Sequence, residues 1–182
     1  MTEGTVLDTT IHEPSTTAGE VEMLLFALER SRAQFAWKCD GLDAADLRRP
    51  HPPSTMTLGG LLKHLALVEE LYAWCVTGQP PGRPWDSVDF EAEPGWEWRS
   101  AAGDPPGELY ALWRGAVERS TAGIARALAD GDLDQPTPTP SGESTNLRRI
   151  LVDLHDEYAR HVGHADLLRE AVDGLVGEDP PQ

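Results

Sequence analysis

Four segments of the chain repeat hydrophobic residues at intervals of three and four, which is the spacing of one face of an α-helix. The first segment covers about 18–38, and Thr17 with Glu20 has the spacing of a capping box at its start. The second begins after Thr57, a residue suited to cap a helix, and runs to about Thr77, where glycine and proline follow. The first half of the chain is therefore predicted to hold two amphipathic helices.

Two further helices are predicted in the second half. One begins near Pro106, because proline is favoured in the first turn of a helix, and its apolar face fades after Leu128. The other is capped by Asn146 and ends near Gly174. Four amphipathic helices without a convincing strand predict an all-α fold, a four-helix bundle.

The remaining segments define the domain organisation that we expect. Residues 1–16 have no hydrophobic period and are predicted to form a flexible N-terminal arm, 17–176 the bundle domain and 177–182 a flexible tail. Residues 83–106 carry three tryptophans among acids and glycines, again without a helical period. We expect this segment to be a long irregular connection between the second and third helices that packs across the bundle.

The net charge of the chain argues against nucleic acids and anionic membranes as partners. The length of 182 residues suits a single domain, and 31 Asp and Glu against 15 Lys and Arg give a net charge of −16. Such a chain repels the phosphates of nucleic acids and anionic membrane surfaces, so neither is an expected partner. We interpret the seven acidic residues between 86 and 108 as a solvated surface.

Cysteine usage and the terminal sequence predict a cytoplasmic location. The two cysteines, Cys39 and Cys75, are far apart and form no CxxC motif, which argues against a disulfide framework and against a zinc knuckle. The N-terminus lacks the basic start and apolar core of a signal peptide. No stretch approaches the roughly 18 apolar residues of a membrane span.

Ionisable residues on predicted buried faces are the strongest chemical signal. His64 lies on the apolar stripe of the second helix. In the fourth helix, Asp153, Glu157, His161 and His164 stand at i, i+4, i+8 and i+11 and share one face with its apolar residues. A buried carboxylate is costly unless it is paired or bound to a metal, so this pattern needs an explanation.

Two interpretations of this pattern remain open. The first is a structural polar network in which the side chains satisfy one another. The second is a metal site built from one imidazole of the second helix with a carboxylate and an imidazole of the fourth, since bundle cores hold metals in this way. Such ligands suit Zn²⁺, Ni²⁺ or Fe²⁺, and three protein ligands leave a coordination position open for water or a thiolate.

Two segments of the sequence carry a resemblance to a known family. TLGGLLKHL at 57–65 and EYARHVGHADLLRE at 157–170 resemble the two signature helices of the DinB-like superfamily, in its DUF664 branch. That branch is related to mycothiol-dependent maleylpyruvate isomerases and to bacillithiol transferases. The resemblance covers about 20–175 and implies a DinB-like four-helix bundle that binds one divalent metal ion, Zn²⁺ first, with mycothiol as a co-substrate.

The resemblance also implies a ligand set. His64 and His161 fall on two metal-binding positions of the family, and Glu157 stands where many relatives have histidine and the isomerase branch has glutamate. His164 is expected beside these ligands or as a substitute for one of them. Asp153, one turn away, is a candidate to orient a ligand.

Three functions are compatible with these residues. The first is a mycothiol-type thiol S-transferase or thiol-assisted isomerase that acts on a small electrophilic metabolite, with Arg160 as a candidate contact for a carboxylate of the thiol. The second is a metal-dependent hydrolase, isomerase or cyclase that uses no thiol. The third is a non-catalytic, stress-associated metal-binding protein that forms a homodimer.

Overall fold

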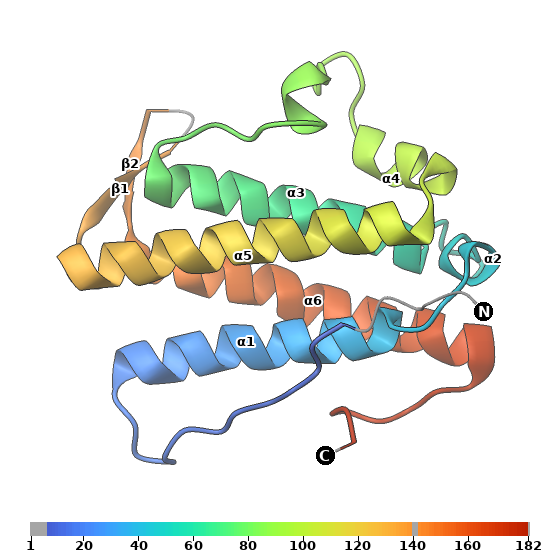
Figure 1. Ribbon diagram of the computed structural model, residues 1–182, viewed down its shortest axis with the longest axis horizontal. Coiled ribbons are helices and arrows are strands. Elements are labelled where there is room, and N and C mark those ends of the chain that lie inside the picture. Colours follow the sequence, from blue (N-terminus) through green and yellow to red (C-terminus); the bar gives the residue numbers. More distant parts are fainter. Residues whose placement is uncertain (1–6, 140–141, 182) are drawn as a thin grey trace.

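The computed structural model describes residues 7–139 and 142–181, and its long helices form the predicted four-helix bundle (Figure 1). The fold is therefore all-α apart from one small hairpin. The four long helices are α1 (Glu20–Cys39), α3 (Leu58–Thr77), α5 (Pro106–Asp130) and α6 (Leu147–Asp173).

The directions of the helices explain the long connection in the middle of the chain. In Figure 1, α3 and α5 run the same way, whereas α1 and α6 run the opposite way. The chain leaving α3 must therefore return along the whole bundle before α5 can begin. Residues 78–105 make this return, and parallel neighbouring helices cannot be joined by a short turn.

The connection is less irregular than predicted. It contains a 3₁₀ turn at Trp85–Ser87, a short helix α4 (Trp96–Ser100) and a second 3₁₀ turn at Ala101–Gly103. These pieces are only one or two turns long, so no hydrophobic period could reveal them in the sequence. A one-turn helix α2 (Ala44–Leu47) follows α1 and was also not predicted.

Two short strands lie in the break before α6, where no strand was expected. The strands β1 (Pro136–Pro138) and β2 (Ser144–Asn146) pair antiparallel, with Thr137 opposite Thr145. Three residues are too few to show the alternation by which a strand is recognised.

Three predicted helix ends, in α3 and α6, are confirmed by their capping residues. The side chain of Thr57 accepts a hydrogen bond from the backbone N–H of Gly60, and the side chain of Asn146 accepts one from Arg149. Gly174 ends α6 with a φ of 81°, a left-handed conformation that glycine adopts without strain. Local side-chain chemistry therefore sets the bounds of α3 and α6.

The predicted capping box at the start of α1 is wrong. The helix begins at Glu20 and Gly19 occupies the N-cap position, so Thr17 lies outside the helix. The Thr17 hydroxyl instead lies 3.1 Å from the hydroxyl of Ser15. A capping box requires glutamate in the third helical position, and here Glu20 is the first.

The core lies between the four helices and is centred on aromatic side chains. Phe35 of α1 contacts Trp113 of α5 and Tyr158 of α6 edge to face, with ring centroids 5.7 and 6.1 Å apart. Helix α3 packs against both α5 and α6. Side chains of α3 and α6 therefore face each other inside the bundle.

The segment before α1 and the segment after α6 both pack near the α1 helix. Leu7, within the predicted N-terminal arm, is 2% exposed, and its backbone N–H donates to Asp40. After α6, the carbonyl of Gly177 accepts a hydrogen bond from the buried Lys38, and Asp179 pairs with Arg30. Among the described residues, no helix combines the length and the apolar character needed to cross a membrane.

Candidate metal centre

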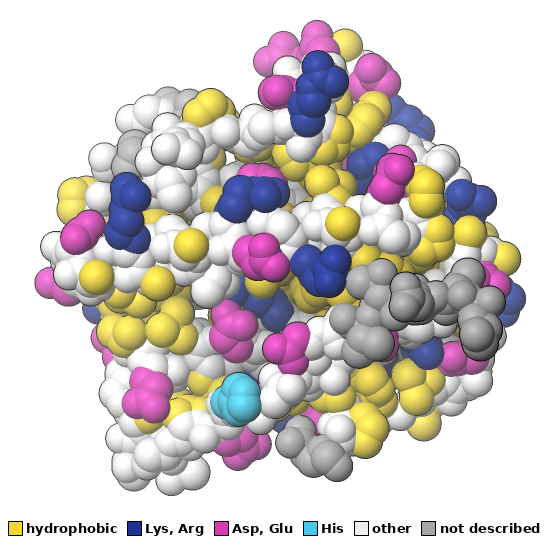
Figure 2. Space-filling model, in the orientation of Figure 1, with side chains coloured by type: hydrophobic (Ala, Val, Ile, Leu, Met, Phe, Trp, Pro, Cys, Tyr) yellow, Lys and Arg dark blue, Asp and Glu magenta, His cyan; other side chains and the backbone are white. Residues whose placement is uncertain are grey.

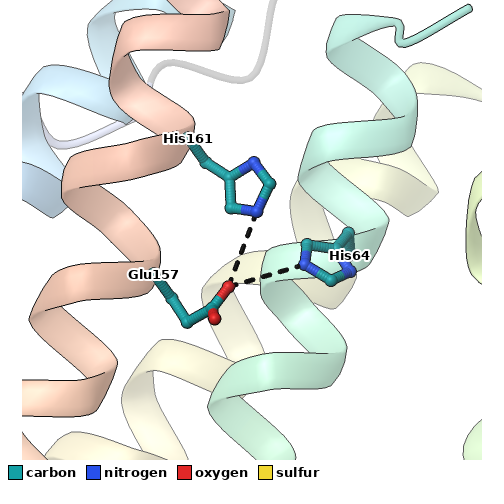
Figure 3. A group of neighbouring side chains, drawn as sticks. All are labelled: His64, Glu157 and His161. Carbon is teal, nitrogen blue, oxygen red and sulfur yellow. Dashed lines mark ion pairs between the residues drawn. The ribbon is translucent and has the colours of Figure 1, made fainter.

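His64, Glu157 and His161 converge between α3 and α6 (Figure 3). One carboxylate oxygen of Glu157 lies 3.8 Å from Nε2 of His64 and 3.5 Å from Nε2 of His161. One ligand atom from each residue falls within 4.8 Å of the others. Glu157 and His161 are one helical turn apart, so a single face of α6 presents both to His64.

The donor set and its spacing fit a divalent metal. Two imidazole nitrogens and a carboxylate oxygen are ligands that Zn²⁺ accepts. Two ligand atoms at about 2.1 Å from a tetrahedral ion are separated by roughly 3.4 Å, close to the observed nitrogen–oxygen separations. His64 and Glu157 keep 19% and 26% of their side chains exposed, so the cluster is partly open to solvent.

Burial keeps the His161 ring neutral at neutral pH. The residue is 7% exposed, and desolvation lowers the pKa of its imidazole to about 4, helped by the positive charge that His64, His164 and Arg160 can carry. A metal-binding imidazole must be unprotonated. No proton therefore has to leave His161 when a cation binds at pH 7.

Two residues of α4, Glu97 and Trp98, contact the His64 ring and orient it. Glu97 Oε1 lies 3.4 Å from Nδ1 of His64, and the Trp98 ring stacks on the imidazole with centroids 4.4 Å apart and an interplanar angle of 24°. With Nδ1 directed at Glu97, Nε2 is the nitrogen that faces Glu157. A carboxylate behind a histidine is a common way to orient a metal ligand.

Glu97 and Asp104 are exceptions to the interpretation of the middle acidic segment as a solvated surface, whereas its other five acids are exposed. Glu97 is only 7% exposed, and Asp104 pairs with the buried Lys63 at 2.6 Å. The Lys63 ammonium also lies 4.2 Å from the centre of the Trp96 ring. These contacts fasten the connection to α3, and no pattern within the segment itself indicated which acids would turn inward.

Gly60 makes room for Trp98. A Cβ atom built on Gly60 would lie 3.0 Å from Cε3 of Trp98 and 3.1 Å from the Thr57 hydroxyl. The absence of a side chain one turn before His64 therefore lets the indole approach α3 and cover the imidazole. The sequence shows the glycine pair before His64, but only the fold shows what it accommodates.

The other predicted site residues lie nearby with partners of their own. Nδ1 of His164 is 3.2 Å from Nδ1 of His161, on the side of that ring away from Glu157. Asp153 accepts hydrogen bonds from Arg149 at 2.6 Å, and within the described part of the chain it forms no hydrogen bond or ion pair with the three clustered residues. Its carboxylate is therefore turned along α6.

Arg160 is a surface residue next to the cluster. Its guanidinium donates to Asp156 at 2.8 Å and to Glu157 at 3.3 Å, and 54% of the side chain is exposed. The Arg160 side chain therefore lies beside the carboxylate of the cluster with donors facing solvent.

A second buried polar group, which sequence reasoning missed, lies deeper in the bundle. The Glu69 carboxylate is fully buried and accepts hydrogen bonds from Arg32 at 2.6 and 2.7 Å, from Tyr158 at 2.7 Å and from Ser120. Trp113 donates in turn to the Tyr158 hydroxyl at 2.9 Å. A structural polar network therefore exists around this carboxylate of α3, at residues other than the four ionisable ones considered for the fourth helix.

The fold and the interhelical cluster place the chain among the DinB-like helical bundles. A family model described as mycothiol S-transferase matches residues 23–174, and the chain belongs to this family. No curated protein matches the chain.

Solved structures show the same bundle. A mycothiol-dependent maleylpyruvate isomerase superposes with a TM-score of 0.59 at 18% identity, over 80% of this chain and 60% of the isomerase. A mutant of a mycothiol-dependent maleylpyruvate isomerase gives a TM-score of 0.61 at 17% identity, over 89% and 65%. A conserved protein from Enterococcus faecalis gives 0.66 at 15% identity, over 87% and 100%. This chain thus spans less than two thirds of the two isomerase chains, and the likeness concerns the fold.

Proposed function

We propose that this protein is a metal-dependent enzyme that transfers a mycothiol-type thiol to a small electrophile, or uses the thiol to assist an isomerisation. The observation that carries the proposal is the convergence of His64, Glu157 and His161 at ligand distances in a chain of the mycothiol S-transferase family. Zn²⁺ is the first candidate metal, with Ni²⁺ and Fe²⁺ as alternatives that accept the same ligands.

His64, Glu157 and His161 would hold the metal. When bound there, a divalent ion lowers the pKa of a thiol, so that the nucleophilic thiolate is present at neutral pH. Glu97 and Trp98 keep the His64 ring directed at Glu157. Arg160 offers guanidinium donors at the exposed side of the cluster, where they can contact a carboxylate of the electrophile or of a carboxylate-bearing thiol.

The reaction can be tested with mycothiol and monochlorobimane. The thiol sulfur forms a bond to the chloromethyl carbon, chloride leaves with its electron pair, and the thiol proton passes to solvent. We expect the Zn²⁺-loaded protein to accelerate formation of the fluorescent thioether and His161→Ala to lose this acceleration. Failure of the Zn²⁺, Ni²⁺ and Fe²⁺ forms with mycothiol across a panel of electrophiles would refute thiol transfer, and metal-dependent turnover without thiol would favour the hydrolase or isomerase hypothesis.

Removal of the carboxylate behind His64 is expected to weaken metal binding. We predict that Glu97→Ala raises the dissociation constant for Zn²⁺ by about 10- to 100-fold, because the His64 ring loses the contact that orients it. Glu97→Gln keeps an oxygen acceptor and should lose less. Competition with a chromophoric chelator measures the constant.

Glu93→Ala is the matched control, since Glu93 is an exposed glutamate of the same connection. We expect this control to bind Zn²⁺ as the unchanged protein does. Equal losses in Glu93→Ala and Glu97→Ala would mean that overall charge, and not orientation of His64, governs the affinity.

A further inference from the structure

A cavity of about 540 Å³ opens between α3, α5 and the start of the connection after α3. Its volume lies in the range of roughly 300–1,000 Å³ that small-molecule sites occupy. The charged side chains that line it are Glu70 from α3, Arg83 from the connection, and Arg119 and Arg126 from α5. Three guanidinium groups thus share one cavity with one carboxylate.

Two of the three positive charges are not compensated by the protein. Arg119 forms an ion pair with Glu70, whose side chain is 7% exposed, so these two charges offset each other. Among the described residues, the guanidinium groups of Arg83 and Arg126 form no hydrogen bond or ion pair. In a chain with a net charge of −16, the cavity therefore carries a local excess of two positive charges.

The cavity is separate from the candidate metal centre. None of His64, Glu157 and His161 lines it, and α6 contributes no residue to its wall. Figure 2 shows the side of the molecule formed by α5, where Lys and Arg side chains are interspersed with acidic ones. Binding in the cavity thus requires neither the metal nor the proposed reaction.

The geometry points to a binding site for a small anion in this cavity, a molecule carrying a phosphate or carboxylate group held by Arg83 and Arg126. Guanidinium groups present paired donors that match the oxygens of both groups. The shared chemistry is an oxyanion of at least one negative charge. Because Arg119 is already paired with Glu70, the ligand's charge is expected on the side of Arg83 and Arg126.

The inference can be tested by calorimetric titration of the full chain with inorganic phosphate and, separately, with succinate. We expect at least one of the two to bind, and its identity distinguishes a phosphate ligand from a carboxylate ligand. Arg83→Gln and Arg126→Gln should each weaken binding by about tenfold, because each removes a charged hydrogen-bond donor. Glu70→Gln, which removes the one carboxylate among the described lining residues, should strengthen it.

Two control variants make the outcome decisive. Arg114→Gln removes the same charge from α5 outside this cavity and should leave the dissociation constant unchanged. His64→Ala should also bind the anion normally, which separates this site from the metal centre. The inference is overturned if neither probe binds, if Arg114→Gln weakens binding as much as Arg126→Gln, or if His64→Ala abolishes it.

Discussion

His161→Ala is expected to weaken Zn²⁺ binding by more than about 100-fold, the largest effect that any single change at the candidate metal centre should have. The variant removes one of three ligands, whereas loss of a group that merely supports a ligand costs about 10- to 100-fold. The His161 ring is buried and already neutral at pH 7, because desolvation lowers its pKa to about 4. Its removal therefore takes away a ligand that needs neither deprotonation nor reorientation.

The measurement is a competition titration with a fluorescent zinc chelator, supported by metal analysis of the purified proteins. His155→Ala is the matched control, because it removes a histidine from the same helix that makes no contact with the cluster among the described residues. His164→Ala should fall between the two, since His164 touches His161 and not Glu157. Zn²⁺ binding by His161→Ala that equals binding by His155→Ala would rule out the proposed ligand set.

Glu69→Ala is expected to lower the free energy of unfolding by about 3–5 kcal/mol, because it removes the buried carboxylate that pairs with the buried guanidinium of Arg32 and leaves it only the exposed Glu29 as a charged partner. Arg32 is 3% exposed and donates two hydrogen bonds to Glu69, at 2.6 and 2.7 Å. The Tyr158 and Ser120 hydroxyls lose the same acceptor. A buried charge and two buried hydroxyls that lose their acceptor cost far more than a missing surface contact.

The loss of unfolding free energy is measured by urea denaturation, with the circular dichroism of the helices as the signal. Glu29→Ala is the control, since Glu29 pairs with the same Arg32 but its side chain is 55% exposed, and surface pairs contribute at most about 1 kcal/mol. Replacement of both charges, as in Arg32→Met with Glu69→Leu, should recover much of the stability lost in Glu69→Ala. If Glu69→Ala and Glu29→Ala cost the same, the buried network does not stabilise the fold as described.

The sequence analysis recognised the Glu157–His161 cluster but not the Glu69–Arg32 network. Glu157 and His161 were recognised because they follow one another at helical spacing on an apolar face. Glu69 obeys the same rule, since it stands four residues after Leu65 and eight after Leu61, and Arg32 stands four after Leu28. The same periodicity could therefore have indicated Glu69 and Arg32 as buried charges, although not that they are partners.

The sequence by itself determined the long helices of this protein, although not its short helical turns or its strands. Helical periodicity predicted the four long helices, and the caps at Thr57, Asn146 and Gly174 set the start of α3 and both ends of α6, because these signals act between residues a few positions apart. The same local rule placed Glu157 and His161 on one face of α6.

Only the tertiary structure decided which residues from distant segments contact one another. Glu97 and Trp98 reach His64 from a segment 33 and 34 positions away, and Arg32 meets Glu69 across 37 positions. Periodicity states which face of a helix turns inward but not which segment will cover that face. That choice follows from the packing of the whole bundle. Gly60 leaves space for the Trp98 indole, and the connection that returns from α3 to α5 brings Trp98 to this position.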